Sequence, residues 1–238
     1  MSTNKNPLIS LEKVRKIYKT KAGPLEVLKG INFEVDEGEF VSIVGPSGSG
    51  KSTLINMITG IDRPSSGDVY VAGQRLTKLS ENQVARWRGT TVGVVFQFFQ
   101  LLPSLTVAEN VMMPMNYAGT YRGERRTRAF EMLDKVGLVD VGDKFPSQIS
   151  GGQQQRAAIA RALVNDPKVI VGDEPTGNLD TAASGRMLRL FEEFVKGGTT
   201  IVLVTHDRDL AAHVPRTVEV RAGRLLSGDD VDHQLIAY

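Results

Sequence analysis

Cysteine is absent from the 238 residues of this chain. Its absence excludes disulfide bridges, zinc sites built from thiolates and catalysis by a nucleophilic thiol. A large excess of charge of either sign is also missing, because 29 Lys and Arg residues stand against 27 Asp and Glu residues. Proteins that bind nucleic acid usually carry a basic excess or a basic run. We therefore expect no nucleic-acid partner.

Long apolar runs are lacking as well. A helix that crosses a bilayer needs roughly 20 consecutive apolar residues, and no stretch of this sequence approaches that length. Residues 1–7 are polar and do not form the apolar centre of a signal peptide. If the protein works at a membrane, we expect a separate subunit to cross it.

Glycine and lysine are concentrated in residues 45–52, GPSGSGKS, directly after the apolar run 40–44. A G-x-x-x-x-G-K-S segment between a strand and a helix is the P-loop arrangement. Its glycines let backbone N–H groups surround phosphates, and the positive end of the following helix dipole favours the same anion. Lys51 can reach the β- and γ-phosphates, and the Ser52 hydroxyl can ligate Mg²⁺. The alternative, a glycine-rich turn without function, does not account for the strand, the spacing and the Lys-Ser pair together.

The segment therefore predicts that the chain binds a nucleoside triphosphate. The expected binding residues are Gly45, Pro46, Ser47, Gly48, Ser49, Gly50, Lys51, Ser52 and Thr53.

Four apolar runs of strand length alternate with segments of helical periodicity. The runs are residues 40–44, 92–96, 169–171 and 201–204. The helical patterns cover residues 51–59, 127–136, 152–164 and 181–195. This alternation predicts an α/β fold, with a mainly parallel sheet and helices on both of its faces.

Two pairs of strand-like segments look antiparallel instead. They are residues 8–18 with 27–35, and residues 217–220 with 224–227. A third region, from about residue 98, contains no convincing strand as far as Ser150. We expect a single domain whose nucleotide-binding core comprises residues 1–97 and 156–238, with a helical subdomain of about residues 98–155 inserted into it.

Acidic residues end the apolar run 169–171, in the segment VIVGDE. A buried strand of this kind delivers carboxylates to the sheet edge where open α/β proteins bind ligands. Asp173 can hold Mg²⁺ there, directly or through water. Glu174 can polarise an attacking water as a general base. A strand end with ordinary acidic turn residues is the alternative, and the accompanying P-loop makes it the weaker one.

A second possible phosphate cradle occurs at Ser150, Gly151 and Gly152, ahead of a helical run. Ser150 occupies an N-cap position, and the two glycines allow backbone amides to approach an anion. One chain has no obvious need for two cradles, so we expect this one to serve the nucleotide held by a second copy. Taken alone, a Ser-Gly-Gly turn is weak support.

From about residue 8 to residue 228 the chain resembles the ATP-binding-cassette (ABC) ATPases. Residues 150–153, SGGQ, look like the signature sequence of that family, which is far more specific than a P-loop. Ile149 stands where leucine usually begins the signature, a change of packing and not of chemistry. The resemblance implies a P-loop NTPase core with an antiparallel β subdomain and an inserted helical subdomain. It also implies a homodimer formed through ATP and Mg²⁺.

Further positions match the family in order. The resemblance implies that Tyr18 stacks on adenine, that Gln97 senses Mg²⁺ and water, and that His206 contacts the γ-phosphate. Residues 178–180 fall where the D-loop lies, which implicates Asp180. Without the resemblance, His206 is more simply explained as a cap on a strand end, and Tyr18 as ordinary packing.

Since every expected catalytic position is filled, the resemblance implies ATP hydrolysis. The implied catalytic residues are Lys51, Gln97, Glu174 and His206. The implied Mg²⁺ ligands are Ser52, Gln97 and Asp173. The implied nucleotide contacts outside the P-loop are Tyr18, Gln97, Ser150, Gly151, Gly152, Gln153, Asp180 and His206.

Residues 96–103, 105–111 and 174–180 are similar to one bacterial branch of the family, which serves lipoprotein release, macrolide export, peptide resistance and cell division. This similarity implies a peripheral ATPase subunit on the cytoplasmic face of the inner membrane. Its implied partners are a transmembrane permease subunit and possible periplasmic components, in export or extraction of lipoprotein, peptide or drug.

Two alternatives stay open at this point. The ATPase could transmit force through a membrane partner without moving cargo, as the cell-division branch does. A soluble ABC ATPase acting on DNA or ribosomes is less favoured, because the chain has no extended heptads, no cysteine and one P-loop.

Apolar residues close to Gln97 bear on the membrane partner. They are Phe98, Phe99, Leu101 and Leu102, followed by methionines 112, 113 and 115. They either fill the core of the helical subdomain or contact the partner, for which flexible methionines are well suited.

Overall fold

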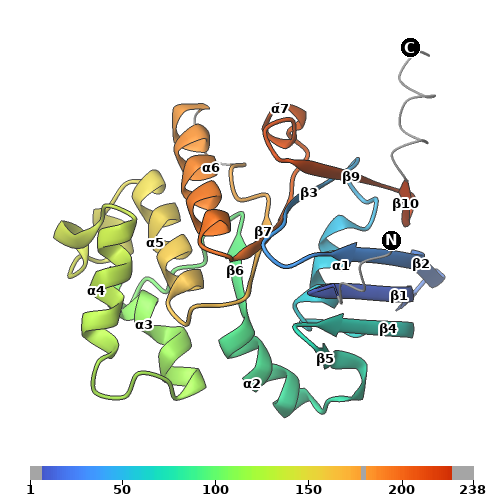
Figure 1. Ribbon diagram of the computed structural model, residues 1–238, viewed down its shortest axis with the longest axis horizontal. Coiled ribbons are helices and arrows are strands. Elements are labelled where there is room, and N and C mark those ends of the chain that lie inside the picture. The colour runs from blue at the N-terminus through green and yellow to red at the C-terminus, as the bar shows by residue number, and fades with distance from the viewer. Residues whose placement is uncertain (1–6, 178–180, 227–238) are drawn as a thin grey trace, which may run out of the picture. The chain divides into compact units, whose positions relative to one another are not determined.

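The computed structural model describes residues 7–177 and 181–226, without the side chains of Thr181 and Ala182. The chain divides into two compact units, the first formed by residues 1–84 and 202–238 and the second by residues 85–201. Figure 1 labels the elements of both units.

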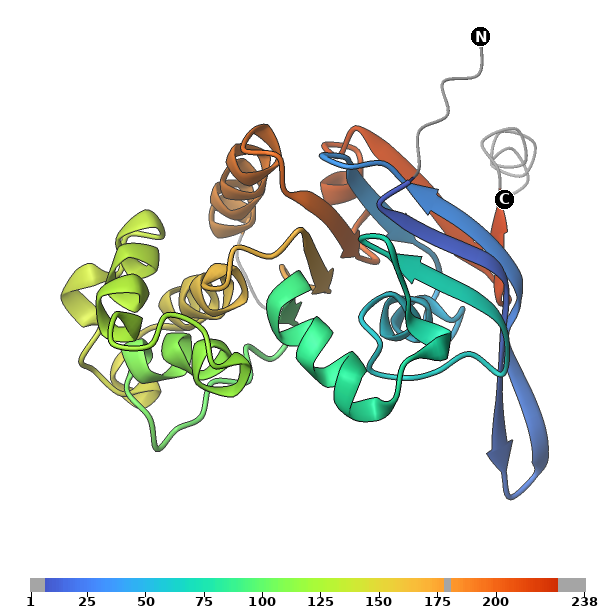
Figure 2. The same ribbon diagram turned by 60° about the horizontal axis from the view of Figure 1, so that its bottom comes forward.

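An antiparallel sheet in the first unit has the strand order β2-β1-β4-β5. Its strands are β1 (Ile9–Thr20), β2 (Gly23–Val35), β4 (Ser66–Val71) and β5 (Gln74–Arg75). The register of β1 and β2 runs from Ile9 opposite Val35 to Thr20 opposite Gly23, and Figure 2 shows the pair as one long hairpin. The predicted antiparallel pairing is confirmed, whereas β4 and β5 follow no pattern that predicted them.

The first unit also contains two parallel strands, and the P-loop directly follows the first of them. These strands are β3 (Phe40–Val44), which is buried almost throughout, and β9 (Arg216–Arg221). β10 (Arg224–Leu226) is antiparallel to β9 and confirms the predicted hairpin at this end. The helices that lie wholly within the described part of this unit are α1 (Lys51–Ile58), α7 (Arg208–Ala211) and the short η1 (Leu76–Lys78).

The second unit contains the parallel strands β6 (Val92–Phe96) and β7 (Val169–Asp173). Its helices are α3 (Val107–Ala118), α4 (Arg125–Lys135), α5 (Gly151–Leu163) and α6 (Thr181–Lys196), with short turns η2 (Val139–Val141) and η3 (Pro146–Gln148). Three of the predicted helices are confirmed to within two residues at each end. α2 (Glu81–Thr91), which crosses the division between the units, buries only Val84 and gave no recognisable pattern.

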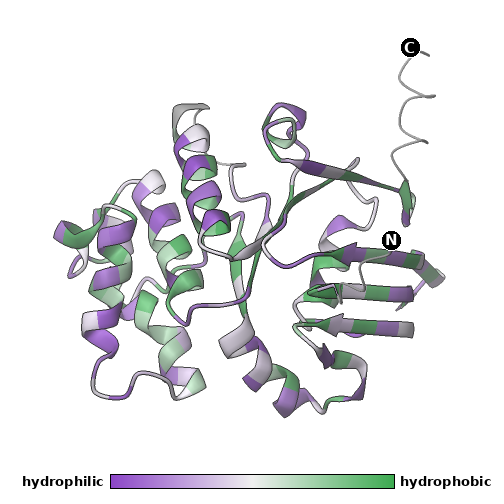
Figure 3. Ribbon diagram, viewed as in Figure 1, coloured by the Kyte–Doolittle hydropathy of each residue, from purple (hydrophilic) through white to green (hydrophobic). Residues whose placement is uncertain are grey.

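No strand occurs between residues 98 and 150, all of which the structure describes, as predicted. α3 and α4 lie in this range and pack against each other and against α5, which follows it (Figure 1). α3 is mostly hydrophobic and α4 mostly hydrophilic (Figure 3), and α3 contacts both of the other helices. α5 also lies directly on β6, where a Cβ on Gly93 would come within 2.2 Å of the Ala162 carbonyl oxygen.

β8 (Thr200–Val204) is fully buried and spans the division between the units. In the second unit the Thr200 N–H donates to the Lys168 carbonyl at 3.0 Å, next to β7. In the first unit the Thr205 N–H donates to the Ile43 carbonyl at 3.1 Å, next to β3. The predicted α/β class with mainly parallel strands is thus confirmed. Within the described ranges, no helix combines the length and apolar character that crossing a bilayer requires.

Candidate functional site

The P-loop connects β3 to α1, and glycine is required at two of its positions by the rest of the first unit. A Cβ on Gly45 would lie 2.1 Å from the Val220 carbonyl oxygen, and one on Gly50 would lie 3.0 Å from the Val27 carbonyl oxygen. The φ angles are 150° at Gly45 and 108° at Gly50, values that disfavour other residues. The carbonyl groups of Val220 and Val27 therefore leave no room for a side chain at these two positions of the loop.

Lys51 turns its ammonium group back into the loop. Its Nζ donates to the carbonyl oxygens of Gly45 at 2.7 Å and Pro46 at 3.0 Å, and the side chain is buried. The first turn of α1 contains no acidic residue, so the positive end of its dipole is not compensated there. The Ser49 hydroxyl is also buried and has no hydrogen-bond partner among the described residues. A cationic cradle with an unsatisfied hydroxyl fits a phosphate chain.

The turn between β9 and β10 is hydrogen-bonded to the P-loop. The Gly223 N–H donates to the Ser49 carbonyl at 3.0 Å, and the Gly223 carbonyl accepts from the Lys29 N–H at 2.8 Å. Residues 222–223 show in the sequence only as a turn, so this role was missed. The sequence signal for these two residues is limited to the Ala-Gly pair itself, whose φ angles are 47° and 79°.

Tyr18 lies beside the P-loop helix in the first unit. Its hydroxyl donates to Asp62 at 2.8 Å, and Lys16 Nζ, which donates to Asp62 at 2.6 Å, lies 4.8 Å from the ring centroid. Burial raises the pKa of the Tyr18 phenol, as does its bond to Asp62, against an opposing hydrogen bond with Thr53. This position suits contact with a ligand of the P-loop, and stacking on adenine stays a prediction. Asp62 was not singled out from the sequence.

His206 follows β8, which lies next to β3 at the edge where the P-loop begins. Its neighbour Asp207 is the N-cap of α7. The Asp207 carboxylate accepts from the N–H groups of Asp209 at 2.9 Å and Leu210 at 3.1 Å at the start of α7. His206 itself is exposed at this edge, and its contact with a phosphate stays a prediction.

The second unit brings three predicted residues together. Phe96 of β6 is paired with Asp173 of β7, so the residues that follow them, Gln97 and Glu174, leave the sheet at the same edge. A Cβ on Gly177 would come within 3.0 Å of Gln97 Nε2 and 3.4 Å of the Glu174 carbonyl oxygen. Glu174 has a φ angle of 50°, a strained conformation of the kind that functional sites retain.

α5 holds the segments that follow both strands. Gln155, which is buried, donates from its amide to the Pro175 carbonyl after β7. Arg161 donates to the carbonyls of Phe99 at 2.7 Å and Gln100 at 2.6 Å after β6. Burial lowers the pKa of the Arg161 guanidinium, and these carbonyl contacts fix two residues with positive φ angles, 21° and 50°.

Arg161 and Gln155 brace these segments, and sequence reasoning gave neither of them a role. The available signal was the arginine at 161 in a stretch that is otherwise apolar from Ala157 to Leu163.

The N-terminus of α5 carries a capping box. Ser150 Oγ accepts from the Gln153 N–H at 3.3 Å, and Gln153 Oε1 accepts from the Ser150 N–H at 2.9 Å. Gly151 and Gly152 have ordinary helical φ angles, and a Cβ on either would meet nothing within 4 Å. Asp180 lies outside the described residues. The structure thus places the predicted site residues in two groups, one in each unit.

Comparisons with known proteins agree with this arrangement. A family model described as ABC transporter matches residues 28–177, more than half of the chain. PvdT of Pseudomonas aeruginosa, a pyoverdine export ATP-binding/permease protein, is 45% identical over 234 residues, which are 98% of this chain and 35% of that protein. YvrO of Bacillus subtilis, an uncharacterized ABC transporter ATP-binding protein, is 46% identical over 228 residues, which are 95% of this chain and 100% of that protein.

The chain therefore spans about a third of the length of PvdT and the whole of YvrO. Among solved structures, the ATP-binding cassette MJ0796, a post-hydrolysis dimer with ADP and phosphate, is similar with a TM-score of 0.85 and 40% identity. That similarity covers 92% of this chain and 97% of the other. The chain belongs to the ABC transporter family, as its ATP-binding cassette.

Proposed function

We propose that two copies of this cassette enclose two ATP·Mg²⁺ and that their closing and opening drive a separate transmembrane permease. Each nucleotide contacts the P-loop of one copy and residues 150–152 of the other. MJ0796 is dimeric in its solved structure, which supports the same assembly here. The observation that carries the proposal is the pair of glycines at the start of α5.

Glycine inside a helix costs stability relative to alanine, by about 1 kcal/mol. At position 45 the need for glycine arises within the chain itself, because the Val220 carbonyl excludes a Cβ there. At positions 151 and 152 nothing within the described chain requires glycine, since the φ angles are ordinary and the space around both residues is open. A group from outside the chain that must approach this backbone closely explains both glycines. The phosphates of a nucleotide held by a second copy are such a group.

Replacing Gly151 with alanine tests this directly. We expect the Gly151→Ala variant to unfold in urea at the same concentration as the parent or higher, with a gain of up to about 1 kcal/mol. We expect its ATP hydrolysis to fall at least roughly tenfold, because the methyl group occupies the space that the phosphates of the partner's nucleotide need.

Gly185→Ala on α6 is the matched control, since Gly185 also has an ordinary φ angle and its Cβ would meet only the end of the Arg189 side chain, at 3.7 Å. It should gain stability without losing hydrolysis. Full hydrolysis by Gly151→Ala would remove these glycines from the nucleotide site.

For the remaining residues of each composite site we propose the roles that the family resemblance implies. Lys51 neutralises charge on the transferred phosphate, and Glu174 accepts a proton from the attacking water. Gln97 and His206 orient the water and the γ-phosphate, and Tyr18 stacks on adenine. These assignments are supported by the edge that Gln97 and Glu174 share in the second unit and by the P-loop geometry in the first.

Magnesium fits the available donors. Ser52, Gln97 and Asp173 would hold the ion through a hydroxyl, an amide oxygen and a carboxylate, which are the hard oxygen ligands that Mg²⁺ prefers. When bound, the ion neutralises negative charge on the β- and γ-phosphates. Among the described residues there is no cluster of three acidic or histidine side chains, and a site with a single carboxylate needs none.

Exposed apolar side chains on the second unit favour a membrane partner. Phe98, Leu102 and Tyr117 are 70%, 43% and 83% exposed. Exposed apolar surface of this kind is typical of interaction sites. Of the methionines considered for this contact, Met115 belongs to the core and is fully buried.

The segment that carries Phe98 and Leu102 is held at both ends. Arg161 binds the carbonyls of Phe99 and Gln100, and the buried Asn110 accepts from the Leu102 N–H at 2.7 Å and donates to its carbonyl at 3.1 Å. A shape fixed in this way suits the transmission of force to a permease by the proposed helical subdomain, residues 98–155.

Loss of the Arg161 contacts should loosen this segment. We expect Arg161→Met to speed amide hydrogen exchange in residues 98–102 by roughly tenfold or more, since two hydrogen bonds to a charged donor are removed. Hydrolysis should fall while ATP affinity is retained, because the P-loop belongs to the other unit. Exchange measured by mass spectrometry on the variant and on Arg122→Met, an exposed arginine of the same unit, gives the comparison. Unchanged exchange in residues 98–102 would contradict the bracing role.

The naming of PvdT as an export protein supports export as the direction of transport. We place the cassette peripherally on the cytoplasmic face of the inner membrane, with a permease and possible periplasmic components as partners. Co-purification with the membrane protein encoded next to its gene would test the partnership, and failure to bind that protein would contradict it.

A further inference from the structure

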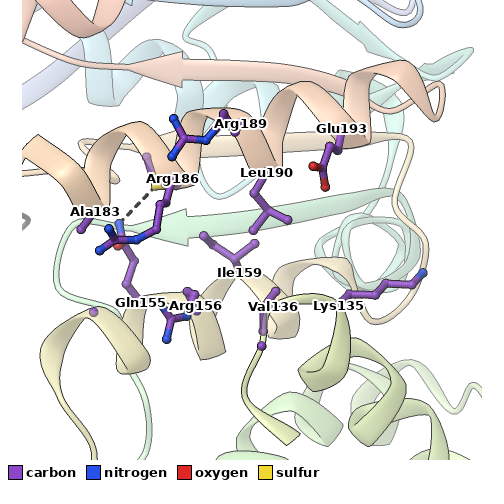
Figure 4. A pocket seen from close by; sticks show the side chains of 13 residues that line it. Lys135, Val136, Gln155, Arg156, Ile159, Ala183, Arg186, Arg189, Leu190 and Glu193 are labelled. Carbon is purple, nitrogen blue, oxygen red and sulfur yellow. Dashed lines mark hydrogen bonds between the residues drawn. The ribbon is translucent and has the colours of Figure 1, made fainter.

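A pocket of 460 Å³ lies entirely within the second unit. It is bounded by the end of α4, the first turns of α5 and one side of α6 (Figure 4). Its volume falls in the range that holds small organic ligands. No nucleotide-binding role accounts for it, although Gly152 contributes to its border.

The middle of the pocket is apolar. Val136, Ile159 and Leu190 lie there in Figure 4, and Met187 also lines the pocket. Ile159 is fully buried and Met187 almost so. The Gln155 amide closes this wall, because it is already bonded to the Pro175 carbonyl and to Met187 Sδ, at 3.2 Å from the sulfur. This floor favours an apolar group.

The border of the pocket is cationic. Its charged residues are Lys135, Arg156, Arg186, Arg189 and Glu193, which is four positive groups against one negative group. In the part of the chain that the structure describes, none of these side chains forms an ion pair, whereas Arg128 of the same unit pairs with Glu131 and Asp166.

Arg156 gives the clearest sign of a missing partner. Its Nε is buried and has no hydrogen-bond acceptor among the described residues. A buried N–H without a partner costs folding free energy unless a water or a ligand satisfies it. In Figure 4 the heads of Arg156 and Arg186 lie on the same side of the apolar floor. Two guanidinium groups so placed match the oxygens of a carboxylate or phosphate.

We propose that this pocket binds a single-chain amphiphilic anion, with a carboxylate or phosphate head against Arg156 and Arg186 and its apolar chain over Ile159 and Leu190. A fatty carboxylate and an alkyl phosphate share this chemistry. The inference does not depend on the composite nucleotide site. Because the ligand touches both α5 and α6, it ties the helix that starts at residues 150–152 to the helix that follows residues 178–180.

Titration calorimetry of the nucleotide-free protein tests the proposal, with each amphiphile kept below its micelle concentration. Dodecanoate and dodecyl phosphate are the two anionic probes, and they distinguish a carboxylate from a phosphate head. Dodecyl maltoside has the same chain with a neutral head, and inorganic phosphate has the head alone. We expect at least one anionic amphiphile to bind, and both control probes to bind at least roughly tenfold more weakly. Equal binding of either control probe, or no binding of either anionic amphiphile, would overturn the proposal.

Substitutions on α6 place the binding in this pocket. Arg186 and Arg189 are exposed, so the double variant Arg186→Gln with Arg189→Gln should keep its fold, which urea unfolding verifies. We expect it to bind the anionic amphiphile at least roughly tenfold more weakly. Lys196→Gln removes an exposed charge from the same helix outside the pocket and should bind like the parent. Unchanged affinity in the double variant would contradict the site.

Discussion

Replacing Glu174 with glutamine should lower the rate of ATP hydrolysis by roughly two to four orders of magnitude, the usual contribution of a general base. Glutamine has the same shape but accepts no proton from water at neutral pH. ATP binding should persist, because the P-loop is unchanged and Gln155 holds the neighbouring Pro175 through its backbone carbonyl. Single-turnover hydrolysis and equilibrium ATP binding measure the two effects separately.

Glu192→Gln is the matched control, since Glu192 is an exposed carboxylate on α6 of the same unit. It should hydrolyse ATP at the parent rate. Hydrolysis at the parent rate by Glu174→Gln would remove Glu174 from the role of base. Loss of ATP binding in that variant would show that Glu174 supports the structure of the site and not its chemistry.

Adding a methyl group at Gly45 should have the largest effect on folding. The new Cβ would lie 2.1 Å from the Val220 carbonyl oxygen, an atom of β9 that the strand ladder fixes in place. With the unfavourable φ angle of 150°, we expect Gly45→Ala to lower the free energy of unfolding by about 3 kcal/mol or more. ATP binding should be lost as the loop shifts.

Gly48 provides the comparison within the same loop. Its φ angle is 76°, and a Cβ there would meet nothing within 4 Å. Gly48→Ala should therefore lose only about 1–2 kcal/mol, the strain of the left-handed conformation. Urea unfolding of both variants measures the difference. Equal losses would mean that the hairpin around Val220 does not confine the P-loop.

The parts of the site that lie at strand ends could be predicted from the sequence. Gln97, Asp173 and Glu174 follow apolar runs, and parallel strands carry their C-terminal residues to one edge of a sheet. The register of Phe96 with Asp173 brings them together as that rule requires. The P-loop was equally accessible, because its signal lies within eight consecutive residues.

The contacts that brace the site could not be predicted in this way. Arg161 lies 62 residues from Phe99, and Val220, whose carbonyl confines Gly45, is still more remote in sequence from the residue it contacts. Nothing in the local pattern selects such partners, because they arise only when strands and helices pack. α2 and the pair β4 and β5 were missed for a different reason, which is weak periodicity.

Glycines illustrate what the structure adds to a motif. Gly45 and Gly151 look alike in the sequence, as members of glycine-rich turns near helices. The structure separates them, because Gly45 faces its own β9 and Gly151 faces open space. The second case supports the proposed composite site between two copies, and the first does not bear on it.

Sedimentation of the Glu174→Gln variant with ATP tests this composite site most directly. With hydrolysis blocked, the chain should sediment at twice its mass of 26.0 kDa, and without nucleotide at its single mass. Adding Gly151→Val to the same variant should keep the single mass with ATP present. A single mass for Glu174→Gln with bound ATP, or a double mass that survives the Gly151 substitution, would contradict the account.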